Sequence, residues 1–211
     1  MNRRGAFLVQ RGTIAPLVVA SLSVLFSVLA FSVDQGIAFA AKAWQENELD
    51  SVRESFMSPS RAFVAKNSEN PGHDVACEVG ELLRKSGFDG EIDVWFFEVP
   101  VKGSSASRRL WGIAIQVRDE SPTLFARGLG IESIPVASKK IVIAEPFSDS
   151  VTWRPDESGN GRYFLAESAE PASFVYERLE GISSYPAEMQ EEVQVAKDKV
   201  KKDGQTGKDR V

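Results

Sequence analysis

The chain has 211 residues, with 25 Lys and Arg against 30 Asp and Glu, for a formal net charge of −5 at pH 7. This modest negative charge, with basic residues scattered along the chain, does not indicate binding to nucleic acid or to acidic lipid. The one cysteine, Cys77, excludes an intramolecular disulfide; we expect a buried free thiol there, with pairing between two chains as the alternative.

The most informative stretch is the uncharged run from Thr13 to Val33, which is rich in Leu, Val, Ala and Phe. A helix rises about 1.5 Å per residue, so this run covers roughly 30 Å, the thickness of the hydrocarbon core of a bilayer. Pro16 lies in the first turn of the expected helix, where a missing N–H group costs little. We therefore predict one transmembrane helix over residues 13–33.

The charges on either side of the span predict its orientation. The span is preceded by Arg3, Arg4 and Arg11 in a basic segment, residues 1–12, and is followed directly by Asp34. By the positive-inside rule, the N-terminus is cytoplasmic and the larger C-terminal part of the chain is exported. The expected topology is that of a single-pass membrane protein.

Two cleavage events compete with a retained anchor. Residues 38–40, Ala-Phe-Ala, fit the small-x-small pattern of a signal-peptidase site, but the apolar run is longer than that of a usual signal peptide. A cut after Gly12 matches the shape of a prepilin leader, yet Leu17 then occupies the fifth position, where prepilin-like substrates usually carry Glu. The sequence leaves the retained anchor and both cuts open.

Residues 34–57 remain compatible with a helix. No Gly or Pro occurs between Ile37 and Met57, and Pro59 then ends the helical pattern. We expect one unbroken helical rod of about 65–70 Å over residues 13–57, in preference to an anchor followed by a separate short helix. The apolar residues at helical spacing in the exported extension are Ile37, Ala41, Trp44, Val52 and Phe56.

The sequence that follows predicts a linker over residues 58–73 and an exported domain over residues 74–180. A helix is expected to begin at Asp74, as its N-cap, and to end near Phe88, with Gly87 as the C′ residue. Strands are expected at 91–99, 110–117 and 131–144, with a short helical turn at 121–130, a hairpin between 151–153 and 162–165, and a final short segment at 173–179.

The expected fold class is α+β, with an N-terminal transmembrane helix extended into an exported helical rod, then a small antiparallel sheet domain with one packed helix. Residues 91–99 carry aromatic side chains on both faces, as expected of a central or helix-covered strand. Residues 181–211 are highly charged and are expected to be largely disordered, with some helix near 188–201.

No constellation of side chains predicts catalysis, and we expect no cofactor, metal ion or small-molecule substrate. The only histidine, His73, lies in a turn without the partners that a triad or a metal site requires. Phosphate-binding and dinucleotide-binding glycine motifs are absent from the sequence, as is Gly-x-Ser-x-Gly. The polar loop at 102–109 is interpreted as solvated. Three tryptophans, Trp95, Trp111 and Trp153, are expected to pack within the domain rather than to form a sugar-binding surface.

Two segments resemble the TadE/TadG-like proteins of tight-adherence (Flp) pilus systems. The first runs from Arg11-Gly12 through Pro16-Leu17 and the apolar span to Asp34-Gln35-Gly36, matching a basic-Gly junction, an apolar helix and an Asp-x-Gly just past the membrane. The second is a turn between two strands that is similar to a later segment of the family. Its matching residues are Pro122, Phe125, Gly128 and Gly130.

This resemblance implies a membrane-anchored pilus-assembly or minor pilin-like structural protein, of the shorter TadE type, in the bacterial cytoplasmic membrane. The implied partners are the lipid bilayer and pilin or other minor pilin-like subunits. The alternative is a single-pass, membrane-anchored extracytoplasmic binding module unrelated to pili. The residues implied in the membrane anchor and assembly face are Pro16, Leu17, Asp34, Gly36, Ile37, Ala41 and Trp44.

Overall fold

The computed structural model describes residues 14–100, 109–144 and 159–206. The basic segment 1–12, nearly all of the polar loop at 102–109 and the strand expected at 151–153 lie outside the described residues. The chain divides into two compact units. We call them the helix–hairpin unit, residues 1–41 and 120–135, and the sheet unit, residues 42–119 and 136–211.

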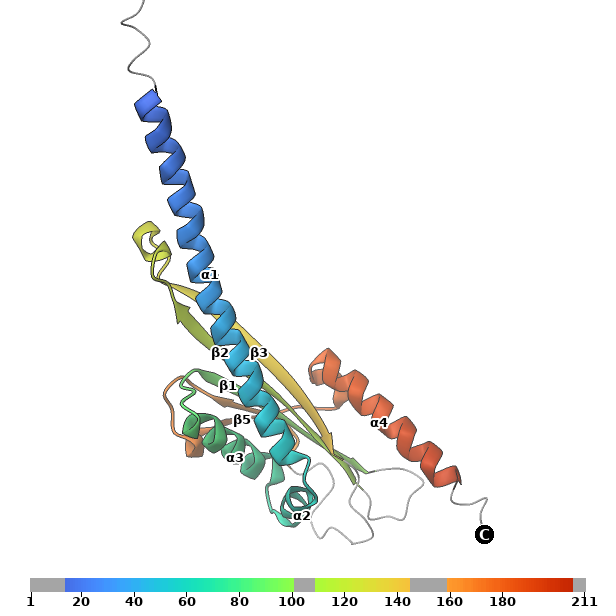
Figure 1. Ribbon diagram of the computed structural model, residues 1–211. Coiled ribbons are helices and arrows are strands. Elements are labelled where there is room, and N and C mark those ends of the chain that lie inside the picture. The colour runs from blue at the N-terminus through green and yellow to red at the C-terminus, as the bar shows by residue number, and fades with distance from the viewer. Residues whose placement is uncertain (1–13, 101–108, 145–158, 207–211) are drawn as a thin grey trace, which may run out of the picture. The chain divides into compact units, whose positions relative to one another are not determined.

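Helix α1 runs without a break from Ile14 to Phe56 (Figure 1), which confirms the prediction of one continuous helix. Among the described residues, α1 is the helix that is long and apolar enough to cross a membrane. The apolar side chains of its N-terminal part are exposed, Leu17 by 69% for example, as a membrane-facing surface requires. The C-terminal part of α1 belongs to the sheet unit, where Leu49, Val52 and Phe56 are buried in the core.

The segment that we predicted as a linker contains a second helix, α2 (Pro59–Asn67), so the loop prediction was wrong there. Pro59 occupies the first helical turn, where proline favours a helix start rather than a break. Helix α3 (Pro71–Lys85) also begins earlier than predicted. Its N-cap is Asn70, whose side-chain oxygen accepts a hydrogen bond from the N–H of His73, and Asp74 lies in the first turn instead.

Gly87 is the C′ residue after α3, as predicted, and has a φ of +95°. The N–H of Gly87 donates to the carbonyl of Arg84, and the N–H of Phe88 donates to the carbonyl of Leu83. These two bonds form a Schellman motif, and its left-handed C′ position is the reason for a glycine.

The sheet has five strands in the order β3-β2-β1-β4-β5, and the α+β prediction is confirmed. The central strand β1 pairs antiparallel with both β2 and β4. Strand β4 pairs with β1 and β5, and the segment 151–153 that we expected as its hairpin partner is not described. The strands are β1 (Glu91–Pro100), β2 (Arg109–Pro122), β3 (Ser133–Ala144), β4 (Gly161–Leu165) and β5 (Val175–Arg178).

Each face of the central strand has its own hydrophobic cluster, which confirms the prediction of a covered central strand. One cluster contains Ile92, Val94 and Phe96 of β1 together with buried residues of α1 and α3. The other contains Trp95 and Phe97 of β1. The apolar residues that cover this second face from the C-terminal segment are Tyr185, Met189 and Val193.

The second cluster corrects our expectation for the C-terminal tail. Helix α4 runs from Ala187 to Thr206, so residues 187–206 are helical rather than largely disordered. Met189 and Val193 are one helical turn apart and fully buried, although the residues between them are polar or charged. Among the described side chains of α4, only these two buried apolar positions mark its packed face, which is too weak a helical periodicity to recognise in a highly charged sequence.

Candidate functional site

The connection between β2 and β3 is a compact turn that we call the hairpin tip, residues 123–131. It contains a 3₁₀ helix, η1 (Ala126–Leu129). The C-cap of η1 is Gly130, which has a φ of +85°. The N–H of Thr123 donates to the carbonyl of Glu132 at 3.0 Å and closes the base of the tip. The short helical turn predicted here is therefore present, with a glycine in the left-handed position that ends it.

The carboxylate of Asp34 binds this tip through three successive backbone N–H groups. Asp34 lies on α1 and is only 1% exposed. Its Oδ1 accepts from Leu124 N at 2.7 Å, its Oδ2 accepts from Ala126 N at 2.6 Å, and both oxygens accept from Phe125 N at 3.2 Å. Consecutive N–H groups at the start of a helical turn form a favourable site for an anion. Within the helix–hairpin unit, Asp34 thus joins α1 to the tip.

These contacts determine the charge of Asp34. Burial by itself raises the pKa of the carboxyl group, but the hydrogen bonds from Ala126, Leu124 and Phe125 outweigh it, so the pKa is lowered from the usual 3.8. Asp34 is consequently ionised at neutral pH. Its negative charge is balanced by backbone N–H dipoles, because they are the donors that the structure places against both of its oxygens.

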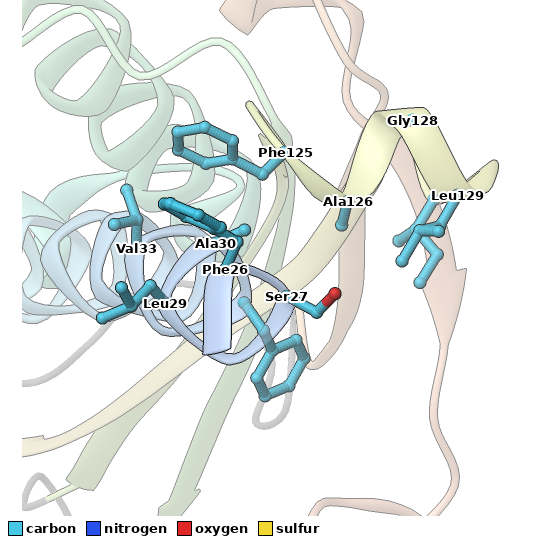
Figure 2. Close-up of a pocket in the computed structure, with 11 residues that line it drawn as sticks. Phe26, Ser27, Leu29, Ala30, Val33, Phe125, Ala126, Gly128 and Leu129 are labelled. Atoms are coloured by element: carbon cyan, nitrogen blue, oxygen red, sulfur yellow. The ribbon is translucent and has the colours of Figure 1, made fainter. Parts of the chain in front are cut away.

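An apolar groove of about 670 Å³ lies between α1 and the hairpin tip, directly beside the Asp34 contact (Figure 2). Ser27 is the one polar side chain in its lining, and its hydroxyl donates to the carbonyl of Ser23 at 2.8 Å within α1. The groove therefore offers no unpaired side-chain hydroxyl, amide or charge to a ligand. Its lining residues are Phe26, Ser27, Leu29, Ala30, Phe31, Val33, Phe125, Ala126, Gly128, Leu129 and Ile131.

The structure brings together the two segments that the sequence singled out separately. Asp34 contacts Phe125 of the hairpin tip, which also contains Gly128 and Gly130. Pro122 directly precedes the tip. The other predicted residues do not gather at this junction. Gly36 is exposed with open space where a Cβ would stand, Ile37 and Ala41 are partly buried along α1, and Pro16 and Leu17 lie in its first turn.

Trp44 lies in the sheet unit and is 37% exposed. Its ring lies 6.2 Å from that of Phe88, centroid to centroid. Sequence reasoning missed Leu124 and Leu129 on the tip, and Phe26 and Leu29 on α1. Their apolar character was the available signal, but nothing in the sequence placed the tip against the helix.

Two groups of the sheet unit that could carry chemistry, Asp93 and Cys77, have structural partners. Asp93 is fully buried and is bound by Arg118 at 2.7 Å and by Arg162 at 2.6 Å. Cys77 is only partly buried; its thiol donates to the carbonyl of Pro171 at 3.3 Å, and burial raises its pKa. In the part of the chain that the structure describes, His, Cys, Asp and Glu form no group of three that could hold a metal ion.

Comparisons of the chain with models of protein families, with curated proteins and with solved structures found no match. The physical features of the junction are a buried, ionised carboxylate and an apolar groove, both near the point where the exposed apolar part of α1 ends.

Proposed function

We propose that the chain is a membrane-anchored structural subunit of the pilus-assembly or minor pilin-like kind, acting in a tight-adherence or type IV-like secretion system. The observation that carries this proposal is α1 itself, a single helix with an exposed apolar N-terminal part and a C-terminal part packed into a folded sheet unit. The proposed location is the bacterial cytoplasmic membrane, with residues 1–12 in the cytoplasm.

An exposed apolar helix suits assembly because lipid and neighbouring apolar helices solvate it about equally well. Transfer of α1 from the bilayer into a bundle of pilin-like helices therefore changes the hydrophobic burial little. The continuous helix links this surface directly to the sheet unit, which supplies a separate folded surface for contacts with other subunits.

The junction at Asp34 supports the resemblance to TadE/TadG-like proteins. The Asp34-Gln35-Gly36 segment and the 122–130 turn carry that resemblance, and they contact one another through the backbone N–H groups bound to Asp34. The two segments that carry the resemblance are thus parts of one physical junction.

The same contact supports retention of the span. Cleavage after Ala40 would remove Asp34 and leave three N–H groups of the tip without their acceptor. A cut after Gly12 would preserve Asp34 and nearly all of the apolar run, so prepilin-like processing is compatible with the folded junction.

Deletion of the gene in its native host tests the function. We expect loss of surface pili, recovery on complementation with the wild-type gene, and co-sedimentation of the tagged full-length protein with pili sheared from complemented cells. Normal piliation of the deletion strain would refute the proposal. Membrane fractionation of the same cells is the control, because it reports anchoring independently of pilus formation.

A further inference from the structure

The hairpin tip exposes an unusual set of large apolar side chains. Leu129 is 82% exposed and Leu124 is 67% exposed, and Phe125 and Ile131 are also about half exposed or more. A cluster of such residues within one short turn is, in soluble proteins, a mark of contact with a partner or a membrane. Three of the four, Phe125, Leu129 and Ile131, line the groove together with α1, so the tip adds to the apolar surface of that helix.

The position of the tip along α1 indicates what surrounds this surface. The helix residues that line the groove lie between Phe26 and Val33, the last two turns or so of the apolar run. They extend about 10 Å along the helix axis from its end at Val33. If residues 13–33 span the hydrocarbon core, the tip lies at the depth of the acyl chains in the leaflet at the C-terminal end of the span.

Most backbone N–H groups of the tip have acceptors within the protein, which favours entry into an apolar phase. Irregular backbone is tolerated at membrane depth only where its polar groups have partners within the protein. Asp34 binds the three N–H groups at the start of the tip. Three later N–H groups donate to carbonyls of the same turn, namely Gly128 to Phe125, Gly130 to Arg127 and Ile131 to Ala126.

The chemistry of the groove selects an apolar occupant. Its one polar side chain, Ser27, is hydrogen-bonded within α1, and its walls are otherwise aliphatic, aromatic or glycine. The groove continues the apolar surface of α1, which the bilayer would surround on its other sides. An acyl chain fits this chemistry without requiring a polar partner.

We propose that the hairpin tip enters the bilayer beside α1 and that lipid acyl chains of the leaflet at the C-terminal end of the span fill the groove. The inference rests on the membrane anchoring that is part of the proposed function. Arg127 is the exposed cation of the tip, and its long apolar stem is able to carry the charged end to the headgroups. The chain thereby contacts the membrane at two places, a transmembrane helix and a monotopic turn.

Depth-dependent fluorescence quenching tests the inference on the full-length protein in phosphatidylcholine vesicles. In a Cys77→Ala background, a single environment-sensitive fluorophore is attached through Leu129→Cys, a position exposed enough to accept it without disturbing the fold. Matched labels at Leu22→Cys, within the span, and Ser183→Cys, exposed in the sheet unit, are the references. Quenching is measured with acyl-brominated phosphatidylcholine and with aqueous iodide.

We expect the label at position 129 to be quenched by brominated lipid several-fold more than the label at position 183, and to be protected from iodide as at position 22. A label at Leu124→Cys should behave in the same way. Iodide quenching at 129 equal to that at 183, with strong lipid quenching at 22, would overturn the inference and leave the anchoring intact.

Protection of position 129 from both quenchers would indicate a protein occupant such as a second copy of the chain, and would also overturn the inference. Absence of lipid quenching at position 22 would show that α1 does not span the bilayer. That result would refute the anchoring itself, and the inference with it.

Discussion

Asp34 is a buried carboxylate whose charge is balanced by backbone N–H groups of a distant turn. Because these hydrogen bonds outweigh the effect of burial, its pKa is lower in the folded state than in the unfolded chain. The ionised carboxylate therefore stabilises the junction at every pH above its unfolded pKa. This contribution is lost as the pH falls through the folded pKa, below the usual aspartate range.

We expect Asp34→Asn to lower the hydrogen-exchange protection factors of the amides of Leu124, Phe125 and Ala126 by about tenfold or more at pH 7. An amide side chain keeps one acceptor oxygen and places an NH₂ group against the donors of the tip. The difference from wild type should disappear as the pH falls below the usual aspartate range. Asn47→Ala, at an exposed position of α1, is the control and should leave these amides protected.

The two glycines of the tip allow a matched comparison of backbone strain. Gly130 has a φ of +85°, whereas Gly128 does not have a positive φ, and a Cβ added to either would meet open space. Gly130→Ala should therefore destabilise the protein by about 1 kcal/mol through strain, while Gly128→Ala should be neutral or slightly stabilising. Thermal unfolding in detergent micelles measures both; equal effects would contradict a conformational role for Gly130.

At the scale of elements, Arg84 stabilises the end of α3. Its guanidinium donates to the carbonyls of Phe88 and Gly90 just after the helix, and to those of Ala166 and Ala169 beyond β4. One side chain thus joins the end of α3 to the segment that follows β4. Hydrogen bonds from a charged group to carbonyls are stronger than those between neutral groups.

Arg84→Ala should lower the free energy of unfolding by about 2–4 kcal/mol, because several carbonyls lose a charged donor at once. The neighbouring variant Lys85→Ala, at an exposed position, should change it by less than about 0.5 kcal/mol. Chemical denaturation of both proteins gives the comparison. A cost for Arg84→Ala as small as that of Lys85→Ala would show that the four contacts do not persist in solution.

Helix α4 contributes to stability through very few side chains. Met189 is fully buried against the aromatic face of β1, whereas Val195 on the same helix is 60% exposed. We expect Met189→Ala to cost about 2–4 kcal/mol and Val195→Ala almost nothing. Limited proteolysis within residues 187–206 should follow the same order, and equal sensitivity of the two variants would indicate that α4 is not docked on the sheet.

At the scale of the whole molecule, the junction makes a prediction about processing. Since Asp34 is required to bind the tip, the mature protein should begin upstream of it, either near Met1 or at Thr13. Mass spectrometry of the N-terminus of the purified protein measures this directly. A mature chain that begins at Ala41 would contradict both the anchoring and the proposed role of Asp34.

Most of the elements followed from local properties of the chain. The membrane-competent helix could be predicted because length, absence of charge and absence of helix breakers are properties of neighbouring residues. The strands β1, β2 and β3 followed from alternation, and Gly87 and Gly130 from the backbone conformations that end a helix or a turn. The aromatic side chains on both faces of residues 91–99 predicted a central or helix-covered strand, and β1 is the central strand with both faces covered.

Only the tertiary structure decided which of these parts meet. The hydrogen bond between Asp34 and Leu124 joins residues separated by 90 positions, and β4 lies between β1 and β5, strands that are far from each other in the sequence. Burial of Met189 in a charged tail was equally invisible in the sequence. Periodicity reports the face that a segment presents, whereas contacts between distant segments depend on how those faces pack together, and one carboxylate after a long apolar run carries no mark of its partner.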